Sequence, residues 1–171
     1  MILYHETDIE SALAISESGT FIAFRDPKNP TDESDFGINC EPNYTHPPYK
    51  GQALRHGAML VMAWDGDVIN TPPNNLGALL DNAVNCAEGW RYLVKAPIDP
   101  HRLRVVNIMY GIEGKLGYIA KMDELAERPP ITNPFLRKMH YLKESFKLKR
   151  RVRHIQRKKP FITQILHGNQ A

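Results

Sequence analysis

Residues 58–64 read Ala-Met-Leu-Val-Met-Ala-Trp, and Asp65 and Gly66 follow them directly. A short, unbroken apolar run that ends in an Asp-Gly turn is typical of a buried β-strand. The run is far too short to span a bilayer, which takes about 20 apolar residues in a helix. The sequence therefore predicts a strand here, and no membrane partner.

Strand-like stretches lie on both sides of this run and outnumber the helices between them. Thr7 and Glu10 have the spacing of a capping box for a helix that ends at Gly19. A second helix is predicted at residues 76–87. A mixed α+β fold fits this pattern better than a doubly wound parallel sheet does. The predicted strands, by their apolar, aromatic and β-branched content, are residues 2–4, 21–24, 35–40, 90–94 and 103–109.

The texture changes after Gly117, where helical patterns at residues 118–127 and 134–157 replace the strands. We therefore divide the chain into a core at residues 1–117 and a helical basic extension at residues 118–171. The first part of the extension carries an apolar stripe, which we expect to pack against the body or a partner. The stripe consists of Phe135, Leu136, Met139, Leu142 and Phe146.

Charge is unevenly distributed along the 171 residues, although the net charge is only +3. Residues 133–171 hold eleven Lys or Arg and one acid, a net +10, whereas the rest holds 11 bases and 18 acids, a net −7. The run from Lys147 to Arg153 reads Lys-Leu-Lys-Arg-Arg-Val-Arg, and Arg157, Lys158 and Lys159 follow it. Such a run predicts a surface for nucleic-acid phosphates or an acidic protein, or one that folds back on the acidic body.

Cysteine and histidine content argues against a disulfide framework and against a metal centre. The two cysteines are too few for such a framework, and both are expected to be reduced thiols. Zinc-type side chains are present, but their spacing fits no compact zinc motif. With no secretory signal at the N-terminus, we expect a cytoplasmic protein, in its own cell or in a target cell. The zinc-type residues are Cys40, His46, His56 and Cys86.

Tyr4-His5-Glu6-Thr7 is the segment most suggestive of chemistry. It places a histidine at the end of a strand, directly before a capped helix. A helix N-terminus beside a polar side chain favours ligand phosphates and ribose hydroxyls. The alternative is that His5 is a partly buried histidine that caps the strand and has no further role.

This segment resembles the first motif of the ADP-ribosyltransferase family, in which an aromatic residue, His, any residue and Ser or Thr close the first strand. Gly37-Ile38-Asn39-Cys40 then stands where that family has a Gly-Ile-Tyr-Phe-like strand. The resemblance covers residues 2–109. It implies an ADP-ribosyltransferase-like core that uses NAD as a substrate. His5 and Thr7 would hold the ribose beside the nicotinamide, and Tyr44 or Tyr49 would stack on the nicotinamide ring, whose positive charge an aromatic face attracts.

The resemblance also implies a catalytic acid just ahead of a later strand, where this chain has Glu88. Its carboxylate would stabilise the positive charge that develops on the ribose as nicotinamide leaves. Asp65 and Asp67, after the strand at 58–64, are rival candidates. Arg25 and Arg55 are the body cations expected to bind the pyrophosphate, because the guanidinium fork matches phosphate oxygens.

Asn39 departs from the family pattern, because many relatives have tyrosine at this position. Three hypotheses therefore stay open. The chain transfers ADP-ribose to a protein or nucleic acid, as a toxin, effector or phage–host conflict protein would. Alternatively, it is a degenerate transferase that binds NAD or only a partner, or a non-catalytic binding module that acts through its basic C-terminal region.

Overall fold

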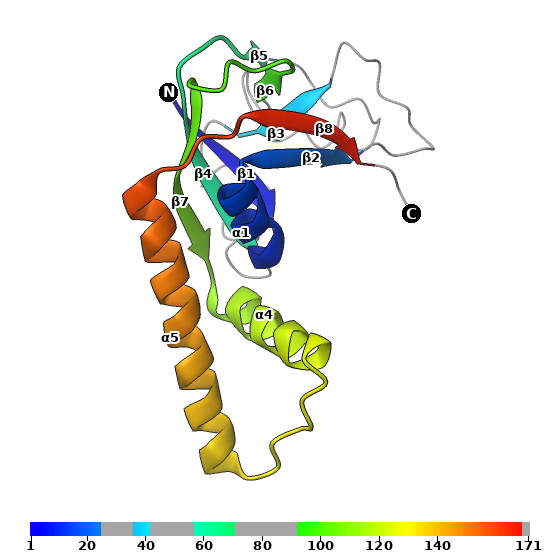
Figure 1. The fold of residues 1–171 in the computed structure, drawn as a ribbon, viewed down its shortest axis with the longest axis vertical. Helices are drawn as coiled ribbons and strands as arrows, with labels where there is room; N and C mark the ends of the chain where they lie inside the picture. Colours follow the sequence, from blue (N-terminus) through cyan, green and yellow to red (C-terminus); the bar gives the residue numbers. More distant parts are fainter. Residues whose placement is uncertain (25–35, 42–56, 71–91, 169–171) are drawn as a thin grey trace, which may run out of the picture.

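The computed structural model describes residues 1–24, 36–41, 57–70 and 92–168, which form a mixed α+β body and a projecting pair of helices (Figure 1). In chain order the body holds β1 (Ile2–Thr7), α1 (Ile9–Ser18), β2 (Thr20–Phe24), β3 (Gly37–Cys40), β4 (Ala58–Trp64), β5 (Ile69–Asn70), β6 (Tyr92–Lys95) and β7 (Leu103–Tyr110). The helices α4 (Ile112–Leu125) and α5 (Pro134–Lys158) follow, and β8 (Gln164–Gly168) comes last. The predicted α+β class is confirmed.

The strand predicted at residues 58–64 is β4, the centre of a three-stranded antiparallel sheet in the order β1-β4-β7. Leu60 lies opposite His5 on one side and Ile108 on the other. Side chains on both faces of β4 are buried, Met59 at 1% exposure and Leu60 at 0%. A strand covered on both faces needs apolar residues at every position, which explains the unbroken run.

Helix α1 follows β1 directly, but its cap differs from the prediction. Asp8, not Thr7, is the N-cap, and its carboxylate accepts from the Ser11 amide at 2.8 Å. The predicted Thr7 cap is wrong because Thr7 is the last residue of β1 and pairs with Ala58. Gly19 ends the helix with a φ of 69°, which confirms the predicted glycine C-cap.

Two smaller sheets complete the body. One is antiparallel in the order β3-β6-β5, and the other pairs β2 with β8 in parallel. Reciprocal backbone hydrogen bonds between Tyr4 and Glu41, of 3.0 and 2.7 Å, join β1 to the end of β3. The predicted strand at 90–94 is observed as Tyr92–Lys95, and the predicted helix at 76–87 lies outside the described residues.

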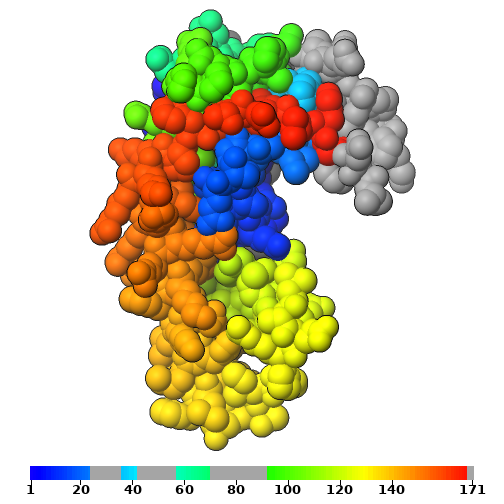
Figure 2. Space-filling view, viewed as in Figure 1, coloured from blue at the N-terminus to red at the C-terminus, as the bar shows by residue number. Residues whose placement is uncertain are grey.

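Helices α4 and α5 form a hairpin whose outer part, residues 112–147, we call the arm; it projects away from the sheets (Figures 1 and 2). Helix α4 begins at Ile112, six residues before the predicted start. The prediction placed the start too late because the two glycines inside the helix resemble helix breakers. Gly114 is tolerated because it packs on backbone: a Cβ there would lie 2.4 Å from the Gly57 carbonyl oxygen. Helix α5 is one helix of 25 residues, begun by Asn133, whose side chain accepts from the Phe135 amide at 2.9 Å.

The C-terminal half of α5 returns the chain to the body, where Leu148, Val152 and Ile155 are buried. The chain then adds β8 beside β2, and the Thr163 amide donates to the Gly19 carbonyl at 2.8 Å. Residues 164–168 therefore belong to the body, a return that the predicted helical extension did not include.

Candidate functional site

His5 lies where β1 approaches β3, and its ring is held on two sides. Its Nδ1 lies 2.7 Å from the backbone carbonyl oxygen of Asn39. The ring of Phe21, on β2, meets it edge-on with centroids 5.0 Å apart. The two segments that carry the resemblance, around His5 and around Asn39, are thus neighbours in space.

The surroundings of His5 determine which nitrogen carries the proton. Burial lowers the pKa of His5, with the hydrogen bond to Asn39 opposing this, so the ring is neutral at pH 7. A carbonyl oxygen only accepts, so Nδ1 carries the hydrogen and donates it to Asn39. Nε2 then keeps its lone pair and can act as a hydrogen-bond acceptor.

The remaining residues of the predicted NAD site divide into two groups. Thr7 is half-buried at the end of β1, two residues beyond His5. The other residues of the predicted NAD site lie outside the described residues, so their predicted roles stay predictions. These residues are Arg25, Tyr44, Tyr49, Arg55 and Glu88. Three residues of the metal alternative, His46, His56 and Cys86, also lie outside the described residues.

Asp65 and Asp67, the rivals of Glu88, lie beyond the far end of β4. Trp64 hydrogen-bonds to Met1, whereas His5 is level with Leu60. Five residues along a strand separate Asp65 from the level of His5, roughly 16 Å at about 3.3 Å per residue. The structure therefore does not bring either aspartate to His5.

Two carboxyl groups that the sequence did not single out lie on the opposite face of β1 from His5. Glu41 pairs with Tyr4, and Glu6 follows Tyr4 by two residues, so the side chains share one face. Burial, then the charge of Glu6, raises the pKa of Glu41 to about 7; burial also raises the pKa of Glu6. The Oε2 atom of Glu41 has no hydrogen-bond partner among the described residues. A carboxyl with this pKa both accepts and donates protons near neutral pH.

Replacing Glu41 with glutamine is expected to raise the free energy of unfolding at pH 8 by about 1–2 kcal/mol, less than the full shift implies because solvent screens a half-buried group, and to leave it nearly unchanged at pH 4.5. The pKa of Glu41 is higher in the folded than in the unfolded chain, so its contribution to stability is full below pH 4.5 and is lost as the pH rises towards 7. Urea unfolding at pH 4.5, 6 and 8 measures this. Glu6→Gln should move the loss to lower pH, whereas an equal gain at every pH for Glu41→Gln would contradict the assignment.

Cys40 is a buried structural thiol within the described residues. Its Sγ donates weakly to the Ile38 carbonyl at 3.7 Å, and burial raises its pKa, so it is not a reactive thiolate. No group of three or more potential metal-binding side chains occurs in the described part of the chain. None of the helices in that part has the length and apolar character of a membrane span.

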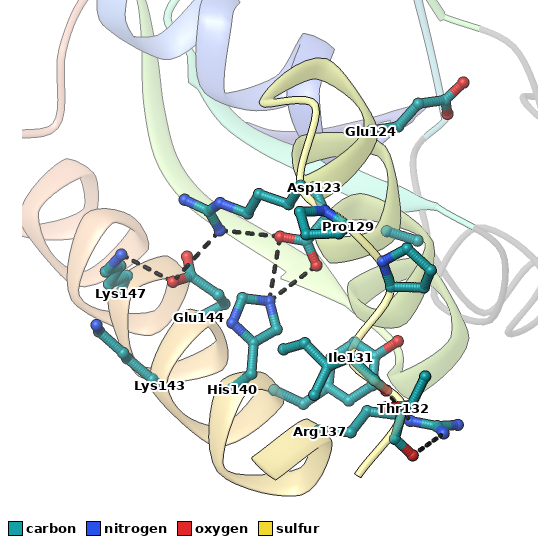
Figure 3. Close-up of a pocket in the computed structure, with 14 residues that line it drawn as sticks. Asp123, Glu124, Pro129, Ile131, Thr132, Arg137, His140, Lys143, Glu144 and Lys147 are labelled. Carbon is teal, nitrogen blue, oxygen red and sulfur yellow. Dashed lines mark hydrogen bonds and ion pairs between the residues drawn. The ribbon is translucent and has the colours of Figure 1, made fainter. Parts of the chain in front are cut away.

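A hollow of about 860 Å³ lies between the ends of α4 and α5, and a charge network crosses it (Figure 3). The Asp123 carboxylate accepts from His140 Nε2 at 2.8 Å and from Arg128 at 2.9 Å. Glu144 accepts from Lys147 at 2.8 Å. Burial opposes the effect, but the bonds from His140 and Arg128 lower the pKa of Asp123. Because cations engage both carboxylates, the network serves to close the hairpin.

The cations of α5 do not form one continuous surface. Lys147 pairs with Glu144, and Arg151 pairs with Glu17 on α1. A row of four exposed cations instead follows the outer face of the helix, because their positions repeat at helical spacing. We call Lys149, Arg150, Arg153 and Arg157 the basic row.

Comparisons with protein-family models, curated proteins and solved structures found no match to the chain. The resemblance to ADP-ribosyltransferases therefore stays a prediction.

Proposed function

We propose that the chain transfers ADP-ribose from NAD to a macromolecular target. The observation that carries the proposal is the fixed neutral ring of His5, whose Nδ1 is 2.7 Å from the Asn39 carbonyl oxygen and whose Nε2 is left as an acceptor. A ribose hydroxyl supplies the matching donor.

In the proposed reaction the bond between the nicotinamide nitrogen and C1 of the ribose breaks, and its electron pair leaves with nicotinamide. A nucleophile of the target forms the new bond to C1 and loses its proton to water. The ribose passes through a cation-like state, which a carboxylate stabilises electrostatically. Glu88 is proposed for that role, with Tyr44 or Tyr49 on the nicotinamide and Arg25 on the pyrophosphate.

The basic row is proposed to recruit the target. Among the described residues, no carboxylate pairs with Lys149, Arg150, Arg153 or Arg157 in an ion pair. Four exposed cations along one helix face favour a nucleic acid or a protein bound to one. The same observation supports the second candidate, a non-catalytic nucleic-acid-binding module.

The experiment is incubation of the purified chain with NAD labelled in its adenylate part and a crude cell extract. Label on protein or nucleic acid, lost in Glu88→Gln, is the expected result. Arg150→Gln with Arg153→Gln should reduce labelling of the target by roughly 10-fold at physiological salt while NAD consumption without target is kept. Lys95→Gln with Arg104→Gln removes two exposed cations elsewhere and serves as the matched control.

The outcomes separate the hypotheses. If the chain neither binds nor consumes NAD but binds nucleic acid, and the arginine pair reduces the slope of log K against log salt by about 2, the second candidate is supported. Binding of NAD without turnover identifies a degenerate transferase.

A further inference from the structure

The arm carries much of the exposed apolar surface in the described part of the chain. Eight of the fourteen exposed large hydrophobic residues lie on it, Phe135 at 70% and Phe146 at 65% exposure among them. The predicted apolar stripe therefore does not pack against the body. A contiguous apolar patch of this kind marks an interaction site.

Four members of the stripe lie on one line along α5. Phe135, Met139, Leu142 and Phe146 fall within about 60° of one another around the helix axis, at 100° per residue. Their steps of four, three and four residues are those of a coiled-coil seam. The same steps are obtained when the stripe is read backwards, with Phe at each end.

A stripe that reads the same in both directions is complementary to a second copy of itself in antiparallel orientation. In that register Phe135 lies opposite Phe146 of the other copy, and Met139 lies opposite its Leu142. This is the self-matching patch that a two-fold axis requires. We propose that two copies of the chain form a homodimer through antiparallel packing of their α5 stripes.

Charges beside the stripe favour the antiparallel over the parallel arrangement. In the antiparallel register Lys138 lies near Ser145 of the other copy, and Lys143 lies near its Leu136, so no cation faces a cation. In a parallel pair each cation of the basic row would lie opposite the same cation of the other copy, and this like-charge contact is unfavourable. The acid of α5, Glu144, points to Lys147 and the hollow beside α4, away from the stripe.

The shape of the chain fits the same register. Residues 134–147 of α5 project from the body, whereas Leu148 is buried against it. In the proposed register Leu148 is level with residue 133 of the other copy, so each body begins where the other arm ends. Arg153 and Arg157 then extend past the partner's arm, which leaves the proposed recruiting surface accessible.

The exposed apolar area of the stripe is of the same order as the area that a standard protein–protein interface buries. Side chains of this size and exposure supply on the order of 500 Å² per copy, against roughly 800 Å² per partner in a standard interface. The aliphatic stems of Lys138 and Lys143 lie beside the stripe and contribute part of the remainder.

Sedimentation analysis of the full chain tests the dimer. The expected result is a species of twice 19.5 kDa at micromolar concentration. Leu142→Glu should weaken association by at least roughly 100-fold, because it buries an unpaired charge near the two-fold axis. Leu125→Glu is the matched control, since Leu125 is also exposed, at 65%, but lies on α4 outside the stripe. Circular dichroism establishes that both variants are folded.

Cysteine cross-linking tests the register. Phe135→Cys and Phe146→Cys, carried on chains of different tag length and mixed under oxidation, should form a mixed disulfide. Neither variant alone should cross-link, and the unmodified chain measures any background from its own cysteines. A disulfide between two Phe135→Cys chains would overturn the antiparallel arrangement.

Two other results would overturn the dimer itself. One is a monomer at every concentration up to about 100 μM. The other is a monomeric chain that sediments with vesicles containing phosphatidylserine, while the Leu142→Glu variant does not. That result would assign the stripe to an anionic membrane surface. Neither result depends on NAD turnover, so the proposed function stands or fails separately.

Discussion

Replacement of His5 by alanine is expected to lower the rate of NAD consumption by on the order of 10²-fold. The ring is neutral and its Nδ1 donates to the Asn39 carbonyl, so under the proposed function Nε2 would accept from the ribose hydroxyl. Alanine would remove that acceptor, although the hydroxyl would still have to leave water. Initial rates of nicotinamide release at saturating and limiting NAD measure the loss in kcat and in kcat/KM.

Asn39→Ala is the control for this experiment. It keeps the backbone carbonyl that orients His5 and changes only an exposed side chain. Its activity should stay within a few-fold of the unmodified chain. An equal loss in both variants would place the important group on the Asn39 side chain, and no loss in His5→Ala would remove His5 from the site.

Gly114→Ala is expected to lower the free energy of unfolding by about 1–3 kcal/mol, although alanine is the better helix former. The added Cβ would lie 2.4 Å from the Gly57 carbonyl oxygen, an atom of the backbone that cannot turn aside. Either α4 or the start of β4 must move. Chemical denaturation followed by circular dichroism measures the change.

Gly117→Ala, in the same helix, is expected to have the opposite effect and to raise the free energy of unfolding. A Cβ at Gly117 meets nothing within 4 Å, so only the gain in helix propensity remains, roughly 0.5–1 kcal/mol of added stability. Stabilisation by both substitutions would show that α4 does not pack tightly on Gly57.

The parts of the fold that the sequence predicts well are those set by local pattern. The apolar run of β4 and the terminal Gly19 of α1 each express a single strong preference, for burial and for positive φ respectively. The start of α4 was missed because Gly114 is selected by a contact with Gly57, 57 residues away, that no local pattern reports. The N-cap was placed one residue early because pairing of Thr7 with Ala58 extends β1 at the expense of the helix.

The candidate site was predicted only in part. The sequence singled out His5 by its position at the end of a strand directly before a helix, and its role in the site stays a prediction. Glu41 was not singled out, because its altered pKa arises from burial and from the charge of Glu6, which a sheet junction creates. The sequence predicted a contiguous basic run at residues 147–153, but Lys147 pairs with Glu144 and Arg151 pairs with Glu17, so these two cations of the run are not part of the basic row. Sequence spacing does not reveal which cations find acids in the fold.

The pairing of β2 with β8 has a consequence for synthesis of the protein. Thr163 hydrogen-bonds to Gly19 across 144 residues, so the parallel partner of β2 is translated long after β2 itself. On the ribosome, β2 waits without this partner while the other strands and the arm are made and until β8 has left the exit tunnel. An unpaired strand edge invites pairing with other chains, so the nascent protein is open to misassembly at this edge until β8 emerges.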